Sequence, residues 1–247
     1  MQDNSAEKKF YLNQLLKDNQ AKGQLLDFET PIKEIFNEYF SSKKRYRIIE
    51  EILDKEKKYN IFVEIGAGDC ASLKYYSETY KVNKIIGYDI AFSDNTYKQN
   101  VYKNVRLLEG NFNNNLPLEN NSVDCLVMMM VIEHLFNPFH SFSEIHRLLS
   151  EDGIAFINLP LVTSIKNRMR LLFGKLPETS VSYEKWFQNE DWDGSHLHYF
   201  SIDSIKKICK KFNLEIVKIK PVGNFNFVKN IFPSFLSNEI SFCVKKI

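Results

Sequence analysis

The sequence predicts an α/β fold in which a mostly parallel β-sheet is flanked by helices. Seven short apolar runs alternate with segments of helical periodicity, and such alternation is typical of parallel β-α-β units. The first run ends in a glycine loop, Gly66-Ala67-Gly68, and ligands bind at this edge of open parallel sheets. The runs expected to form strands are 61–65, 84–88, 105–108, 123–129, 154–159, 215–219 and 240–244.

The segments around these runs have separate predicted roles. Residues 1–58 form a predicted helical extension, in which Thr30-Pro31 opens a helix because proline is favoured at the first helical position. Residues 59–247 would form the sheet domain. Between the fifth and sixth runs, the long connection 161–204 emerges at the ligand-binding edge, so we expect a cap over the substrate. One face of the N-terminal helix would carry Ile32, Ile35, Phe36, Tyr39 and Phe40.

Composition limits the class of protein. The chain has 247 residues, of which 44% are hydrophobic, and this suits one decorated α/β domain. Its 33 basic and 31 acidic residues nearly cancel, so no nucleic-acid partner is expected. Without an apolar segment of membrane-spanning or signal-peptide type, we expect no membrane insertion. The 4 cysteines lack paired spacing, which predicts reduced thiols and a cytoplasmic protein; a homodimer is left open.

The residues around the glycine loop indicate a nucleoside site. Asp89 ends the second run and could accept hydrogen bonds from both ribose hydroxyls. Gly66, Gly68 and Ala71 also satisfy the Gly-x-Gly-x-x-Gly/Ala fingerprint of dinucleotide-binding proteins, which is weak when it stands alone. Glu64 favours the other interpretation, because a carboxylate repels a pyrophosphate and suits the ammonium group of S-adenosylmethionine (SAM).

Further motifs, together with the loop at 63–70, resemble the ordered series of class I SAM-dependent methyltransferases. The resemblance runs from residue 60 to 160, and a weaker echo, His-Leu-His-Tyr-Phe-Ser, lies at 196–201. The further motifs are Leu-Leu-Glu-Gly-Asn-Phe at 107–112, Leu-Pro-Leu at 116–118 with Ser-Val-Asp-Cys-Leu-Val at 122–127, Val-Ile-Glu-His-Leu at 131–135, and Glu-Ile-His-Arg-Leu-Leu at 144–149 with Gly153.

This resemblance implies a Rossmann-like sheet of seven strands, the last one antiparallel, and SAM as the cofactor. Two positions depart from the family pattern. Cys70 replaces the third loop glycine and is expected to narrow the space beside the cofactor, while Asn111 replaces an acid but keeps an acceptor near the adenine. The cofactor contacts that the resemblance implies are Glu64, Gly66, Ala67, Gly68, Asp89, Ile90, Asn111, Phe112, Met129 and Met130.

Three histidines are the candidates for catalysis. His134 follows Glu133 and faces the cleft in similar family members, where it would bind substrate or act as a base; alternatively, this pair only orders the start of a helix. His196 and His198 alternate on an extended segment, so only one of them is expected to reach the cleft. Because no acid cluster with ligand spacing accompanies these histidines, we predict a metal-independent site.

The chemistry of the acceptor decides which groups of the cap would matter. A sugar hydroxyl needs a general base such as one of these histidines. A carboxylate or phosphate-type oxygen is already anionic and needs a clamp, for which Lys166, Arg168 and Arg170 are candidates. Trp192 and Tyr199 would add aromatic contacts to the substrate.

The sequence therefore predicts a SAM-dependent methyltransferase that modifies a small molecule, preferably at oxygen. Resemblance to enzymes that decorate bacterial surface-polysaccharide precursors makes a sugar hydroxyl or a phosphate-type group an option. Two alternatives stay open. The fingerprint at the glycine loop allows an NAD-binding oxidoreductase, and the changes at Cys70 and Asn111 allow an inactive methyltransferase-fold subunit that serves a partner.

Overall fold

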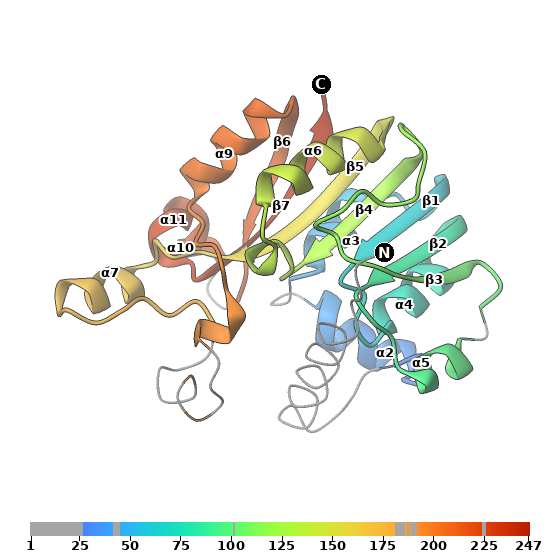
Figure 1. Cartoon of the computed structure of the whole chain (residues 1–247), viewed down its shortest axis with the longest axis horizontal. Helices are drawn as coiled ribbons and strands as arrows, with labels where there is room; N and C mark the ends of the chain where they lie inside the picture. The colour runs from blue at the N-terminus through green and yellow to red at the C-terminus, as the bar shows by residue number, and fades with distance from the viewer. Residues whose placement is uncertain are drawn as a thin grey trace.

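The computed structural model describes residues 27–41, 45–100, 102–180, 186, 188, 192–223 and 226–247. Seven strands form one sheet in the order β3-β2-β1-β4-β5-β7-β6 (Figure 1). Each predicted run lies inside one of these strands, so the predicted sheet is confirmed. The strands are β1 Lys58–Ile65, β2 Lys81–Asp89, β3 Val105–Glu109, β4 Val123–Met129, β5 Leu149–Pro160, β6 Leu214–Pro221 and β7 Glu239–Lys246.

One strand runs against the others. Strands β1 to β5 pair in parallel, whereas β7 pairs antiparallel with both β5 and β6. The antiparallel last strand is therefore confirmed. Because β1, β2 and β4 are parallel neighbours, the segments that follow them emerge at the same edge of the sheet.

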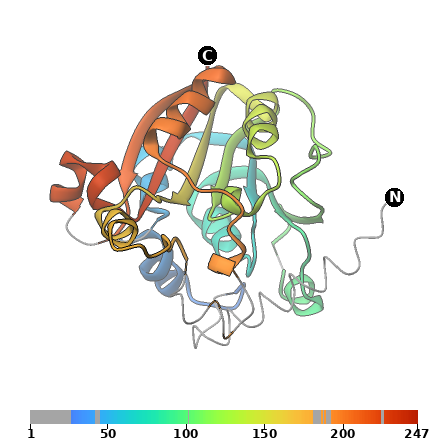
Figure 2. The same cartoon turned by 60° about the vertical axis from the view of Figure 1, so that its left-hand side comes forward.

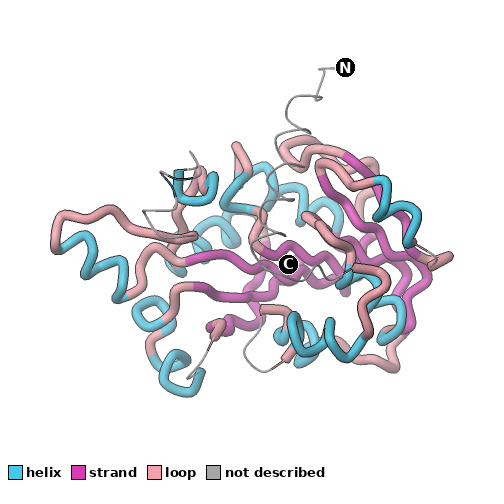
Figure 3. The backbone as a smooth tube through the Cα atoms, turned by 90° about the horizontal axis from the view of Figure 1, so that it is seen from below, coloured by secondary structure: helices cyan, strands magenta, loops and turns pink. Residues whose placement is uncertain are grey.

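Helices cover both faces of the sheet and give three layers (Figures 2 and 3). The helices α6 Pro138–Leu148 and α9 Ile202–Lys211 share one hydrophobic core with Val63 and the strand residues on its face. On the other face, α3 Arg47–Ile52 and α4 Ala71–Thr79 share a second core with Phe62. Neighbouring strand residues point to opposite faces, so the continuous apolar runs of the sequence supply both cores.

The predicted N-terminal helix is present in two parts. The helix α2 spans Ile32–Ile35 and continues as one π-helical segment, η1, over Phe36–Phe40. Ile35 and Phe40 are buried, whereas Phe36 is 37% exposed at the rim. Residues 1–26 and 42–44 of the predicted extension lie outside the described residues, and the domain boundary near residue 58 stays a prediction.

The remaining elements connect the strands and form the cap. Helix α7 begins the 161–204 connection and projects beyond the sheet (Figure 1). Within the described residues, no helix combines the length and the apolar character that crossing a membrane requires. The other elements are α5 Asp94–Gln99, η2 Ile132–His134, α7 Ile165–Leu172, η3 Trp192–Ser195, α10 Asn226–Ile231 and α11 Pro233–Leu236.

Strand β5 begins earlier than predicted, at Leu149, and its pairing with β4 shifts register between Val123 and Cys125. Gly153 lies at this irregularity. A Cβ atom at Gly153 would come within 2.7 Å of the Val123 carbonyl oxygen and 2.9 Å of the Ser150 amide nitrogen. Both are backbone atoms and cannot rotate away, so this position requires glycine although its φ is ordinary.

We expect Gly153→Ala to lower the free energy of unfolding by about 1 to 3 kcal/mol, the usual cost of forcing atoms into a packed region. Urea unfolding followed by far-UV circular dichroism measures this change. The matched control is Glu151→Ala, an exposed position in the same strand, which should stay within about 0.5 kcal/mol of the wild type. Equal effects of the two substitutions would contradict the backbone conflict at Gly153.

Candidate functional site

The glycine loop is held against the end of β2. The Gly66 N–H donates to the Tyr88 carbonyl oxygen at 2.8 Å, and the Gly68 N–H donates to Asp89 Oδ2 at 2.8 Å. Both glycines have positive φ, +72° and +50°, which other residues adopt only with strain. A Cβ atom on Gly68 would have no neighbour closer than the Gly66 carbonyl oxygen at 4.0 Å. The space above Gly68 can therefore admit a ligand against the backbone.

Asp89 is a half-buried carboxylate at the same edge. Its Oδ1 accepts a hydrogen bond from the Ile90 N–H at 2.7 Å, while Oδ2 accepts the bond from Gly68. Burial raises the pKa of Asp89, and hydrogen bonds from the backbone N–H groups of Gly68, Ile90 and Ala91 oppose that rise. Because a carboxylate oxygen can accept more than one hydrogen bond, Asp89 keeps capacity for ribose hydroxyls beside the loop.

Glu64 lies in β1, two residues before the glycine loop, and is 2% exposed. Its Oε1 accepts a hydrogen bond from the Tyr46 hydroxyl at 2.7 Å, and its Oε2 accepts one from the Ser72 hydroxyl at 2.5 Å. Burial raises the pKa of Glu64 to about 8, although these hydroxyls oppose the rise. The predicted contact with a ligand ammonium would therefore run through the Tyr46 hydroxyl or require that hydroxyl to move.

The N-terminal segment contributes two tyrosines that sequence reasoning did not assign to the site. The Tyr39 hydroxyl donates to Asp69 Oδ2 at 2.7 Å, and the Tyr39 and Tyr46 rings stack with centroids 5.1 Å apart. Asp69 also accepts a hydrogen bond from the Ala71 N–H at the start of α4. The only sequence signal for Tyr39 was its position on the apolar face of the predicted helix.

Two residues without the freedom of glycine have positive φ at this edge. Cys70 has φ +64° and Met130, directly after β4, has φ +56°. The Cys70 side chain is fully buried in the core, with its Sγ 3.8 Å from the Gly68 carbonyl oxygen, and its expected effect on the cofactor space stays a prediction. The left-handed backbone at Cys70 explains why glycine suits this position in the family pattern.

The other predicted cofactor residues differ in what they expose. Asn111 Oδ1 accepts hydrogen bonds from the backbone N–H and side-chain amide of Asn113. The Phe112 side chain is 4% exposed and packs against Tyr88, so Phe112 can offer a ligand only its backbone. Met129 and Ala67 are also buried, whereas Ile90 and Met130 are half-buried.

The structure brings Glu133 and two of the predicted histidines together. A carboxylate oxygen of Glu133 and one ring nitrogen each of His134 and His196 all lie within 4.8 Å of one another. The two imidazole rings meet edge to face, with centroids 4.7 Å apart. His198 lies elsewhere, with its Nε2 atom 3.3 Å from the Phe136 carbonyl oxygen.

Glu133 is fully buried, and among the described residues its carboxylate oxygens have no hydrogen-bond partner other than the backbone of Glu133 itself. Burial raises the pKa of Glu133 to about 8, while the charge of Arg45 lowers it and that of Glu239 raises it further. Its main chain is in contrast well bonded, because its carbonyl oxygen accepts from the N–H groups of Leu197 and His198 at 2.8 and 3.1 Å.

The hydrogen bonds of the cap assign the protons on both rings. His134 Nδ1 lies 3.2 Å from the Ser195 carbonyl oxygen, which can only accept, so Nδ1 carries the proton. His196 Nδ1 lies 2.6 Å from the Thr179 hydroxyl, and that hydroxyl donates its single proton to Asp193 Oδ2 at 2.6 Å. Thr179 must therefore accept from His196 Nδ1. When the two rings are neutral, these bonds put the lone pair of each histidine on Nε2.

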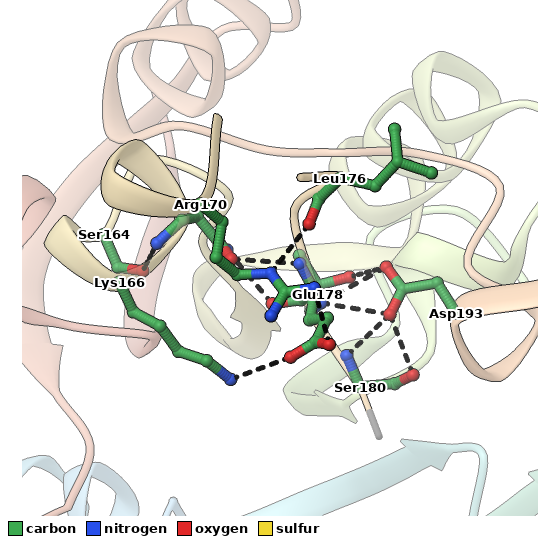
Figure 4. Close-up of polar contacts among 9 residues, drawn as sticks. Ser164, Lys166, Arg170, Leu176, Glu178, Ser180 and Asp193 are labelled. Atoms are coloured by element: carbon green, nitrogen blue, oxygen red, sulfur yellow. Dashed lines mark hydrogen bonds and ion pairs between the residues drawn. The ribbon is translucent and has the colours of Figure 1, made fainter. Parts of the chain in front are cut away.

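Two buried acids organise the cap (Figure 4). Asp193 is fully buried and accepts hydrogen bonds from the N–H and hydroxyl groups of Thr179 and Ser180. Glu178 forms ion pairs with Lys166 at 3.2 Å and with Arg170 at 2.8 Å. These contacts join the first half of the connection to Asp193 in its second half; residues 181–185, 187 and 189–191 of the connection lie outside the described residues.

Some of the predicted acceptor-binding residues are hydrogen-bonded within the cap, whereas others have exposed side chains. Arg170 Nε donates to the Leu176 carbonyl oxygen, and Arg168 Nε donates to that of Thr163, both at 2.7 Å. These bonds favour a structural role for the arginines, and their role as a clamp for an anion stays a prediction. Trp192 and Tyr199 are 57% and 44% exposed, so their side chains are accessible to a substrate.

Comparisons with known proteins place this geometry in context. Residues 10–219 match the family described as methyltransferase domain. The uncharacterized protein MJ1252 of Methanocaldococcus jannaschii is 27% identical over 238 residues, covering 87% of this chain and 91% of that protein.

Similar solved structures share the fold. One is in the complex between the Trm112 methyltransferase activator of Haloferax volcanii and a protein described as a methyltransferase, with TM-score 0.61, 14% identity, and coverage of 87% of this chain and 92% of that chain. Another is a SAM-dependent methyltransferase from Mesorhizobium loti, with TM-score 0.60, 10% identity, and coverage of 81% and 97%. At these identities the likeness shows the fold alone.

We expect Glu64→Gln to change how stability depends on pH. The folded protein holds a proton on Glu64 up to pH about 8, whereas the unfolded chain releases it near the ordinary value of 4.5. Between these values the folded state binds more protons, so rising pH should destabilise the wild type relative to the variant, by at most about 1.4 kcal/mol per pH unit. Urea unfolding of both proteins from pH 5 to 8 measures the difference. Parallel profiles would contradict the raised pKa.

Proposed function

The chain belongs to the methyltransferase domain family and uses S-adenosylmethionine, and on this premise we propose that it methylates a hydroxyl oxygen of a small molecule. The match to the family covers most of the chain, which favours this function over the NAD-binding alternative. A sugar hydroxyl of a surface-polysaccharide precursor falls within the proposed acceptor class.

The residues at the sheet edge fit the cofactor. SAM supplies a methyl group on a positively charged sulfur. The backbone at Gly68 borders open space, and Asp89 beside it has carboxylate oxygens that suit ribose hydroxyls. Glu64 and the Tyr46 hydroxyl would bind the ammonium end, and the Asn111 amide would contact the adenine, as the resemblance to the family implies.

The observation that carries the choice of acceptor is the meeting of His134 and His196 beyond the end of β4. Each ring is neutral when its only proton is on Nδ1, and each then has a basic Nε2 atom. A neutral hydroxyl needs such a base, and its proton would pass to one of these Nε2 atoms during methyl transfer. An anionic acceptor would instead need a cationic clamp, but Arg168 and Arg170 already donate to carbonyl oxygens of the cap.

We expect Asp89→Ala to weaken SAM binding while the fold is retained. A hydrogen bond to a charged group contributes about 1.5 to 3 kcal/mol, so the loss of even one should raise the dissociation constant roughly ten- to a hundredfold. Isothermal titration calorimetry with SAM and with S-adenosylhomocysteine measures this. Asp152→Ala, at an exposed position of β5, is the control and should bind normally. An unchanged dissociation constant for Asp89→Ala would remove Asp89 from the site.

If a histidine acts as the base, its substitution should affect turnover and not SAM binding. His134→Gln or His196→Gln should lower the rate by roughly a hundredfold with SAM affinity unchanged, because general-base catalysis contributes about that much. His198→Gln should have a mild effect, since this ring lies against the Phe136 carbonyl. Transfer of labelled methyl groups from SAM to a panel of sugars and nucleotide sugars measures the rates.

Two outcomes would argue against the proposal. Mild effects of both histidine substitutions, with strong effects on acceptor affinity in Arg168→Ala or Arg170→Ala, would indicate an anionic acceptor. SAM binding without turnover on any acceptor of the panel would favour the inactive partner subunit.

A further inference from the structure

We propose that Glu133, His134 and His196 bind a divalent transition-metal ion. One carboxylate and two imidazoles are a ligand set that zinc, iron and related ions accept, whereas calcium and magnesium prefer oxygen ligands alone. The three donor atoms already lie within 4.8 Å of one another, so small side-chain movements would close them around one ion. Glu133 and His134 come from η2, and His196 comes from the distant cap.

The Glu133 carboxylate supplies the strongest physical reason for a bound cation. It is fully buried, and among the described residues neither oxygen has a hydrogen-bond partner other than the backbone of Glu133 itself. Burying a carboxylate without such a partner is costly. Arg45 is near enough to influence Glu133, but its guanidinium forms an ion pair with Glu239 at 3.2 Å. A metal ion between the carboxylate and the imidazoles would offset the cost.

The hydrogen bonds around both histidines have the form found in metal sites. Histidine ligands usually donate their second ring N–H to a carbonyl or a carboxylate-linked group, which orients the ring and fixes its tautomer. His134 Nδ1 donates to the Ser195 carbonyl, and His196 Nδ1 donates to Thr179, which in turn donates to Asp193. Both rings thus present the Nε2 lone pair that a metal ion requires.

The backbone before His196 is strained in a way that supports the same inference. Asp193, Gly194 and Ser195 have φ of +45°, +65° and +61°, and consecutive left-handed residues persist only where other contacts hold them. The same segment provides the Asp193 carboxylate and the Ser195 carbonyl that orient the two rings. The strained backbone is therefore part of the structure that positions the two histidines.

A metal ion here would revise the prediction of a metal-independent site. That prediction assumed that no acid accompanies the histidines, whereas the structure adds the Glu133 side chain. Three protein ligands leave a coordination position open, as in catalytic zinc sites. In the part of the inference that rests on the proposed function, the ion would occupy the Nε2 lone pairs of His134 and His196 and so replace these histidines as the activating group: it would make the acceptor hydroxyl acidic enough to release its proton to water beside the methyl donor.

The test measures metal binding directly and needs no acceptor. The full chain is produced without a histidine tag, stripped with a chelator and titrated with Zn²⁺ by calorimetry and with Co²⁺ by visible absorption. We expect one ion per chain. Glu133→Gln and His196→Gln should each lower the affinity by roughly a hundredfold or more, and Thr179→Val, which only orients His196, by roughly 10- to 100-fold.

His198→Gln is the matched control, because this histidine is two residues from His196 but lies against the Phe136 carbonyl. Its affinity should equal that of the wild type. Absence of stoichiometric binding by the wild type, or equal affinities of His196→Gln and His198→Gln, would overturn the proposal. If Glu133→Gln fails to fold, His196→Gln and Thr179→Val decide.

Binding of S-adenosylhomocysteine is measured on the same samples. Normal binding of S-adenosylhomocysteine without metal binding would refute the metal site and leave the proposed function standing. Metal binding without any binding of S-adenosylhomocysteine would support the metal site and argue against the function.

Discussion

The acceptor side of the site depends on one pair of backbone hydrogen bonds. The N–H groups of Leu197 and His198 both donate to the carbonyl oxygen of Glu133, and this joins the cap to the segment directly after β4. A buried carbonyl uses both lone pairs in this arrangement. Because His196 immediately precedes these donors and His134 follows the acceptor, the same bonds that fix the cap bring the two imidazole rings together.

Features that weaken a fold are concentrated at this edge of the sheet. Cys70, Met130 and Asp193 have left-handed backbone, and Glu64 and Glu133 are buried acids with raised pKa values. The strands and their helices provide the stability that tolerates these costs. Both acids respond to a cation in the same physical way, because a nearby positive charge lowers the pKa that burial has raised. Both proposed ligands, the ammonium group of the cofactor and a metal ion, would therefore favour the ionised form of these acids.

How far the sequence predicts the structure depends on how local each feature is. The seven strands were predictable because buried parallel strands are continuous apolar runs, and the glycine loop with Asp89 was predictable because neighbouring strands end at one edge. The early start of β5 was not, since its irregular pairing around Gly153 leaves no apolar pattern. The Glu133 cluster was also out of reach, because its contacts join residues from η2 and the cap that no periodicity relates.

The partners of Arg168 and Arg170 were also beyond what the sequence could predict. In the sequence, Arg168 and Arg170 are basic groups in a predicted cap, and nothing there shows that Glu178 will take up the charge of Arg170. The cap satisfies its own charges through Glu178 and Asp193 and leaves Trp192 and Tyr199 exposed. Among the described residues, the glycine loop and Asp89 are hydrogen-bonded to one another, to Tyr88 and to Ile90, and these bonds do not involve the exposed aromatic positions of the cap. The proposed function therefore assigns substrate choice to the cap surface and the chemistry to the edge beneath it.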